Sequence, residues 1–146
     1  MDWAIEKLSE LGVARLVVVQ ADRSVGRPRL ERWQRIARES AKQCGRREFL
    51  ALDHAQGVQA ALGTLPEAGP EAGARLLLDP GGGPIGSRNL PAPVTLAVGP
   101  AGGFTVEECE LFAAASFRRI RIAAPILRTE TAAIGAAALV IALSQT

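Results

Sequence analysis

The chain has 146 residues and a hydrophobic content of 48%, which is enough to bury the core of a single domain. Its net charge of +2 at pH 7 gives no strong overall bias toward acidic or basic partners. The apolar run over 132–143 is too short to span a membrane, and no apolar N-terminal segment with a cleavage site is present. Cys44 and Cys109 lack metal-ligand spacing, which predicts reduced core thiols in a cytosolic protein without a metal site.

The predicted elements alternate between helices and strands. In chain order we expect a helix over 2–11 stopped by Gly12, a strand over 15–20, a basic helix over 29–43, a strand over 48–52, a short helix over 55–62, strands over 75–78 and 94–98, a helix entered at Thr105, a strand over 119–122 and an alanine-rich helix over 132–143. Residues 66–73 repeat Pro-Glu-Ala-Gly, which is typical of a surface loop. The alternation predicts an α/β fold with a mostly parallel sheet and helices on both faces.

The helix predicted over 29–43 carries much of the positive charge of the chain. Residues 22–47 contain nine basic residues, against three acidic ones. At helical spacing Arg35, Arg38 and Lys42 share the face opposite the apolar residues, and Arg46 extends the positive surface beyond the helix. The charge alone leaves two interpretations equally open, a solvated face and a surface that binds nucleic-acid phosphates.

The segment 99–104 reads Gly-Pro-Ala-Gly-Gly-Phe and follows an apolar strand. Thr105 with Glu108 predicts a capping box at the start of the next helix. Glycines allow close backbone approach to a ligand, although a tight strand-to-helix turn would need them equally. The loop matches neither the Walker phosphate motif nor the dinucleotide fingerprint.

The segment 128–132, Arg-Thr-Glu-Thr-Ala, places charge at the start of the alanine-rich helix. Thr129 or Thr131 could cap this helix, and the helix dipole favours Glu130 there. Arg128 gains nothing from that dipole, which indicates an anionic partner or a developing negative charge. Three loops, over 79–83, 99–103 and 123–128, follow strands of the predicted sheet and are expected to converge into one glycine-rich, apolar pocket.

Several motifs together resemble the ribosomal RNA small-subunit methyltransferase E family. The stretch 99–105 is similar to the family's G-P-E-G-G-F-S loop, and 126–132 is similar to its R-I-L-R-x-E-T-A segment. The resemblance also covers 1–13 and the positions Arg32, Trp33, Glu39 and 43–46. Ala101 departs from the family's glutamate, Pro125 from its usual Arg or Asn, and Ala123 from a usual glycine.

The resemblance implies a SPOUT-type α/β knot near the C-terminus, S-adenosylmethionine (SAM) as methyl donor, a homodimer, and methylation of N3 of a uridine in 16S ribosomal RNA. It also implies that residues 1–146 form the catalytic domain, without the PUA-like RNA-binding domain that precedes it in the family. The cofactor-binding residues implied are Leu78, Gly99, Gly102, Ile122, Ile126 and Leu127. Arg128 is implied as the electrostatic catalyst and Glu130 as a base or a helix-dipole partner, with Arg35, Arg38, Lys42 and Arg46 for RNA.

Two other interpretations stay open at this point. The glycine loop could serve as an anion loop in a nucleotide-binding α/β enzyme. Alternatively, the chain could be a dimeric RNA-binding remnant with little or no catalysis, because the loop lacks the glutamate that Ala101 replaces.

Overall fold

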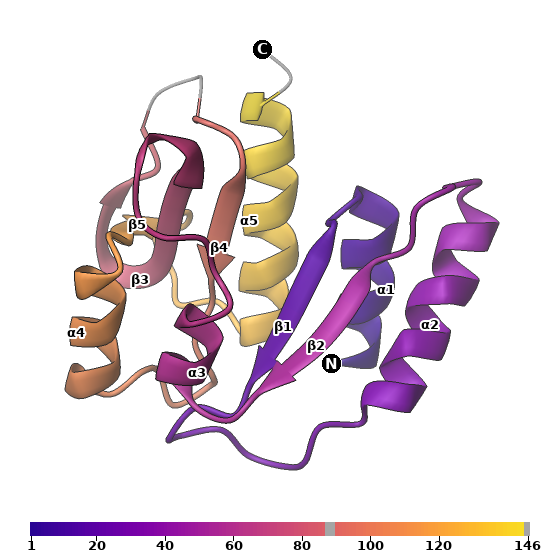
Figure 1. The fold of residues 1–146 in the computed structure, drawn as a ribbon, viewed down its shortest axis with the longest axis horizontal. Coiled ribbons are helices and arrows are strands. Elements are labelled where there is room, and N and C mark those ends of the chain that lie inside the picture. Colours follow the sequence, from indigo (N-terminus) through magenta and orange to yellow (C-terminus); the bar gives the residue numbers. More distant parts are fainter. Residues whose placement is uncertain (87–89, 145–146) are drawn as a thin grey trace.

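The computed structural model describes residues 1–86 and 90–144 and contains alternating helices and parallel strands (Figure 1). Along the chain the elements are α1 (Asp2–Leu11), β1 (Arg15–Val19), α2 (Leu30–Gln43), β2 (Ala51–Ala55), α3 (Val58–Leu62), the short 3-10 helix η1 (Pro70–Ala72), β3 (Ala74–Pro84), β4 (Val94–Ala97), α4 (Val106–Ala114), β5 (Arg118–Arg121) and α5 (Thr129–Ser144). The predicted order of elements is confirmed.

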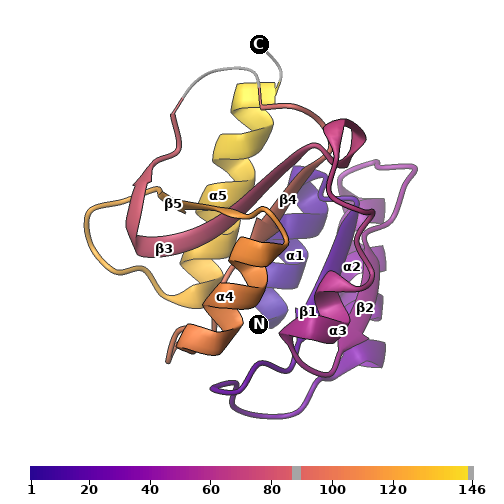
Figure 2. The ribbon, with the colours of Figure 1, turned by 60° about the vertical axis from the view of Figure 1, so that its left-hand side comes forward.

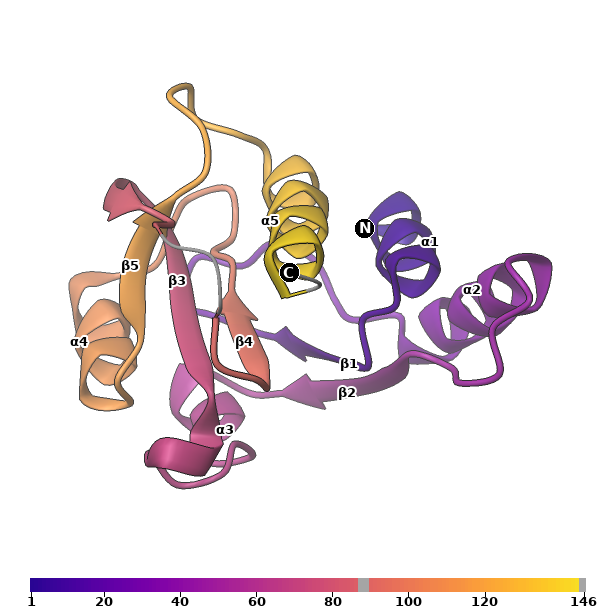
Figure 3. The same ribbon diagram turned by 90° about the horizontal axis from the view of Figure 1, so that it is seen from above.

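The strands form two hydrogen-bonded groups, and every pairing among them is parallel. β1 pairs with β2, while β3 lies between β4 and β5. Figure 2 shows α3 and α4 in front of the strands with α1, α2 and α5 behind them, and Figure 3 shows the same two layers from above. The predicted α/β architecture with helices on both faces is therefore confirmed.

Apolar side chains on the two helical layers bury the sheet from both sides. On one side, Ile5 and Leu8 of α1 pack with Trp33 of α2 and with Leu50 and Leu52 at β2. On the other side, a second cluster is built around two rings that α4 and the turn after it supply, Phe112 and Phe117. A third cluster joins α5 to the three-stranded group through Leu76, Ile120 and Val140. Because these clusters fix the strands, they also fix the loops that leave the strand ends.

Local signals set two helix boundaries as predicted, the end of α1 and the start of α4. Gly12 ends α1 in the left-handed conformation, at φ 93°, where a side chain would be strained. Thr105 caps α4, and its hydroxyl accepts from the backbone N–H of Glu108 while that glutamate accepts from the N–H of Thr105. Both positions follow from short-range chemistry that the sequence carries.

Other boundaries differ from the prediction because tertiary pairing sets them. The strand predicted over 48–52 lies at Ala51–Ala55, in register with β1. The following helix is shortened to Val58–Leu62, since Ala55 belongs to the strand. The structure extends β3 to Pro84, where the sequence predicted a loop over 79–83, and α5 starts at Thr129 instead of 132. Cys44, predicted to be buried, is exposed at the end of α2, and Cys109 is half-buried.

Candidate functional site

Two of the three loops predicted to converge, over 99–103 and 123–128, meet at a cavity of about 350 Å³. The third predicted loop, over 79–83, belongs to β3, and residues 77–80 of that strand form another wall, beside the glycine loop and the segment over 122–127. All six predicted cofactor-binding residues line this cavity: Leu78, Gly99, Gly102, Ile122, Ile126 and Leu127. Most of the wall is apolar or glycine, with Asp79, Arg121 and Thr129 as polar exceptions. A cavity with an apolar wall and few polar groups is typical of a small-molecule site.

The glycine loop is held from two directions through its carbonyl groups. The hydroxyl of Thr129 donates to the carbonyl of Gly99 over 3.0 Å, which ties the loop to the start of α5. Arg23 donates to the carbonyl of Gly102 over 2.9 Å, which ties it to the loop after β1. Gly103, at φ 72°, closes a turn by donating its N–H to the Pro100 carbonyl. The loop therefore has a fixed shape before any ligand binds.

The hydroxyl of Thr129 serves the glycine loop and not a helix cap. The sequence predicted a cap at Thr129 or Thr131, but Thr129 is the first residue of α5 and its side chain bonds to Gly99. The contact is possible because the two segments, 30 residues apart in the sequence, meet at the cavity. Hence one threonine joins two of the three cavity walls.

A buried carboxylate further stabilises the loop after β1. Glu108 is only 5% exposed, and its two oxygens accept from the backbone N–H of Asp22 and of Thr105. The capping box was predicted, but the bond to Asp22 joins segments 86 residues apart and has no local signal. Together with Arg23, Glu108 connects the two strand groups beside the cavity.

The segment over 122–127 offers unpaired backbone groups to the cavity. Among the described residues, none of its N–H or C=O groups forms a hydrogen bond with another backbone group. Ile126 is 84% exposed and Leu127 is half-buried, so both remain accessible. Free donors and acceptors beside an apolar wall fit the edge of a heterocyclic base.

The third wall is shaped by an irregularity between β3 and β5. The pairing shifts between Leu78 and Gly83, so that both residues lie opposite Ile120. Asp79 at this bulge accepts from Arg119 Nε over 3.0 Å and from Nη2 over 2.7 Å, and it also accepts from the N–H of Gly81 over 2.7 Å. Asp79 lies in the stretch 79–83 that was predicted to contribute to the pocket, but its pairing with Arg119, 40 residues away, has no local signal in the sequence.

The two predicted catalytic residues flank the cavity without forming its wall. Arg128 is exposed immediately before α5, and its side chain donates no hydrogen bond to any described residue. Glu130 has a pKa below the ordinary value of 4.5, chiefly because its own backbone N–H at the start of α5 donates to its carboxylate. A carboxyl group with a lowered pKa is a weaker proton acceptor, which favours the helix-start interpretation of Glu130.

The predicted RNA-binding residues lie on another part of the molecule. Arg35, Arg38 and Lys42 are exposed on α2, and α2 and α4 lie at opposite ends of the molecule in Figures 1 and 3. Arg46 differs from the other three, because it is half-buried and donates to the carbonyl of Ser9 near the end of α1 over 3.3 Å. Within one chain, the basic surface of α2 and the cavity are therefore separate.

In 1–86 and 90–144, no group of three His, Cys, Asp or Glu side chains is arranged to hold a metal ion. No helix in the same part of the chain has the length and hydropathy required to cross a membrane.

Comparison with known proteins agrees with this geometry. Residues 1–141 match the family described as an RNA methyltransferase domain. The ribosomal RNA small subunit methyltransferase E of Synechocystis sp. is 34% identical over 141 residues, which cover 88% of this chain and 44% of that protein. This chain thus spans about half the length of that relative.

Solved structures share the fold. The methyltransferase E of Neisseria gonorrhoeae, bound to S-adenosyl methionine, superposes with a TM-score of 0.86 at 31% identity, covering 98% of this chain and 60% of that one. A Legionella pneumophila protein in complex with the bound cofactor SAM has a TM-score of 0.85 at 27% identity, covering 97% and 60% of the two chains. With the match over 1–141, these similarities show that the chain belongs to the RNA methyltransferase domain family.

Proposed function

We propose that this chain is a SAM-dependent methyltransferase domain that methylates N3 of a uridine in 16S ribosomal RNA. The observation that carries the proposal is the cavity between residues 77–80 of β3 and the loops after β4 and β5, in a chain of the RNA methyltransferase domain family. The names and bound ligands of the similar proteins supply the cofactor and the type of RNA.

The residues of the cavity fit such a cofactor. The backbone of 122–127 offers unpaired polar groups for the adenine edge, and Ile122, Ile126 and Leu127 offer the apolar wall. Side chains at positions 99 and 102 would press on Phe104 and Arg23, since a Cβ there lies 3.2 and 3.3 Å from their atoms, so glycine at both positions keeps the loop in place. When bound, SAM supplies an electrophilic methyl group for transfer to the uridine nitrogen.

Arg128 is proposed as the group that stabilises charge on the uridine. N3 carries an imide proton, and its loss spreads negative charge over the neighbouring carbonyl oxygens. A guanidinium near these oxygens lowers the barrier, by about 2.7–4 kcal/mol for a well-placed donor. Arg128 is free for this role because its side chain makes no hydrogen bond within the described part of the chain. Glu130, with its lowered pKa, is assigned to the helix start and not to proton abstraction.

We also infer a homodimer with the SPOUT-type knot, and residues 1–146 as its catalytic domain. α5 presents Ile134, Leu139 and Ile141 as half-buried side chains, and Trp3 on the neighbouring α1 is 54% exposed. Apolar surface on two adjacent helices supports a two-fold contact. A second subunit also offers a way for a basic α2 surface, including Arg46, to approach the cavity of its partner.

Calorimetry with SAM and with S-adenosylhomocysteine tests the cofactor assignment, with ATP and NAD as controls. We expect both SAM and its demethylated product to bind. Binding of ATP or NAD alone would instead support a nucleotide-binding enzyme, and no binding at all would support an RNA-binding remnant. Transfer of a labelled methyl group to 16S RNA, followed by nucleoside analysis for N3-methyluridine, tests the reaction itself.

A further inference from the structure

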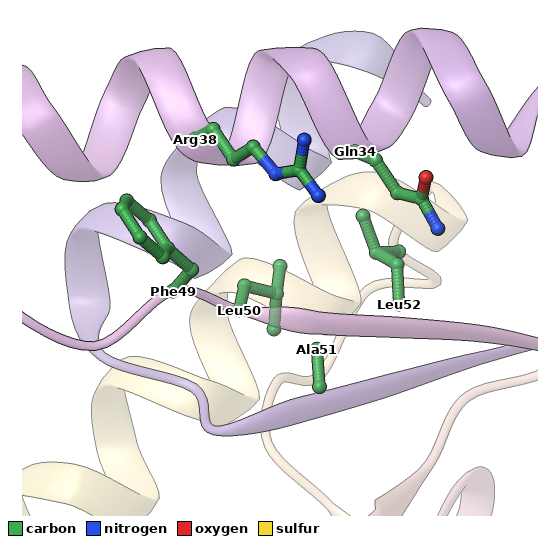
Figure 4. A pocket seen from close by; sticks show the side chains of 6 residues that line it. All are labelled: Gln34, Arg38, Phe49, Leu50, Ala51 and Leu52. Carbon is green, nitrogen blue, oxygen red and sulfur yellow. The ribbon is translucent and has the colours of Figure 1, made fainter.

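A second hollow, of about 270 Å³, lies between α2 and the start of β2, apart from the cofactor cavity (Figure 4). It is lined by Gln34, Arg38, Phe49, Leu50, Ala51 and Leu52. Figure 4 shows Gln34 and Arg38 projecting from α2 over the strand, with Phe49 at the beginning of the strand. We propose that this hollow binds an unpaired base of the RNA substrate, stacked on Phe49, while Arg38 contacts a neighbouring phosphate. The inference rests on the proposed function.

Phe49 is unlike the other phenylalanines of the chain. Phe112 packs against Phe104 and Phe117, at ring-centroid distances of 4.8 and 5.1 Å. Phe49 is 48% exposed, and its ring contacts no other aromatic ring among the described residues. A single exposed apolar side chain is ordinary on a protein surface. The exposure of Phe49 suggests ligand binding only because polar side chains, those of Arg38 and Gln34, line the same hollow.

Arg38 supplies the positive charge that an RNA backbone requires. It is exposed, and in the described ranges its side chain has no hydrogen bond and no ion pair. Arg35 and Lys42, near it on α2, are also exposed and without ion pairs to described residues. Unpaired cations are available to phosphates without first breaking an internal bond. Charge around the hollow therefore favours an anionic polymer as the occupant.

The floor of the hollow gives a base an apolar surface and free polar groups. Leu50 and Leu52 are buried and face the core between α2 and β2. β2 pairs with β1 and with no other described strand, through Ala51 and Ala55, so the backbone groups of the alternate residues Leu50 and Leu52 face away from β1. Gln34 adds a side-chain amide, which both donates and accepts.

A flat aromatic side chain beside cations is typical of single-stranded RNA binding. Stacking tolerates any base, and the phosphate contact makes binding dependent on salt. A peptide strand added to the free edge of β2 is the competing occupant. Such a strand would use backbone hydrogen bonds and would not require Arg38 or the ring of Phe49, so the charge and the aromatic residue together favour RNA.

The test measures binding of a fluorescein-labelled, single-stranded twelve-nucleotide RNA to the chain and its variants by anisotropy. Phe49→Leu keeps an apolar side chain and removes the ring, and we expect affinity to fall by about ten-fold, within the range for loss of one stacked base. Phe49→Trp should retain or increase affinity. Val106→Ala, at a valine 71% exposed on α4, is the control and should leave affinity unchanged.

Salt dependence distinguishes the phosphate contact of Arg38 from the stacking of Phe49, and SAM affinity distinguishes RNA binding from cofactor binding. Arg38→Gln should weaken RNA binding and reduce the slope of log Kd against log salt by about 0.7, the value for one phosphate of a single strand. Phe49→Leu should leave that slope unchanged, and both variants should bind SAM as the unaltered chain does. RNA affinity unchanged by Phe49→Leu overturns the inference, leaving the edge of β2 to a peptide strand. Failure of the unaltered chain to bind RNA overturns the inference and the proposed RNA substrate together, whereas failure to bind SAM overturns only the cofactor assignment.

Discussion

A methyl group on Gly82 would collide with the strand that forms the floor of the cofactor cavity. A Cβ built at Gly82 lies 2.6 Å from the carbonyl carbon of Ile120, 2.7 Å from its nitrogen and 2.8 Å from its Cα. Optimal carbon contacts are about 3.5–4.0 Å, so the β3 bulge and β5 would have to separate by about 1 Å. The obstacle is backbone, which cannot rotate aside as a side chain can, and Ile120 is fully buried.

Gly82→Ala should therefore destabilise the chain by about 1–3 kcal/mol, the usual cost of overpacking. For a chain of this length that loss lowers the Tm by about 3–10 °C. The displacement should also weaken SAM binding, since Ile120 and Ile122 line the cavity. Urea denaturation gives the free energy of unfolding, and calorimetry gives the Kd for SAM.

Gly83→Ala is the matched control, because a Cβ at Gly83 meets no atom within 4 Å. It differs from the test variant by one position in the same strand and should change the free energy of unfolding by no more than about 0.5 kcal/mol. Equal stability and equal SAM affinity for the two variants would refute the reasoning, and would mean that β3 and β5 do not approach as described.

Three further predictions concern the cavity, the reaction and pH. A Cβ at Gly102 lies 3.3 Å from Cβ of Arg23, so Gly102→Val should displace Arg23 and weaken SAM binding. If the collision with Arg23 is the cause, adding Arg23→Gly, which removes that Cβ, restores part of the affinity. Unchanged affinity in folded Gly102→Val places the cofactor elsewhere. Arg128→Gln should lower the methyl-transfer rate by about 100-fold or more while SAM affinity stays constant, as single-turnover kinetics and calorimetry will report; an unchanged rate would remove Arg128 from the mechanism. The pKa of Asp2 lies below 3.8, chiefly because Arg32 donates to it, so this contact stabilises the fold above that pH and is lost as pH falls through the lowered pKa. The difference in unfolding free energy between the unaltered chain and Asp2→Asn should accordingly shrink at acid pH, and a difference that grows there would contradict the assignment.

The order of elements and the convergence of residues near 79, 99–103 and 123–127 could be predicted from the sequence because they depend on local patterns. Gly12 and the Thr105 capping box act within a few residues of their own positions. The alternation of apolar strands with helices brings the strand ends to one edge of a parallel sheet, whatever the side chains beyond them. The residues that line the cavity follow from that arrangement, and the resemblance of two motifs supplied their proposed ligand.

Tertiary structure determined the strand register and the hydrogen-bond partners that join residues far apart in the sequence. Pairing with β1 places β2 at Ala51–Ala55 and not at 48–52. The glycine loop meets the start of α5, so the hydroxyl of Thr129 bonds to the carbonyl of Gly99 and does not cap the helix. Arg46, predicted to bind RNA, also donates to the carbonyl of Ser9. A single sequence does not contain these pairings, because a donor selects among acceptors by distance in the folded chain and not by separation along it. The hollow beside Phe49 arises in the same way, from the packing of α2 over the first residues of β2.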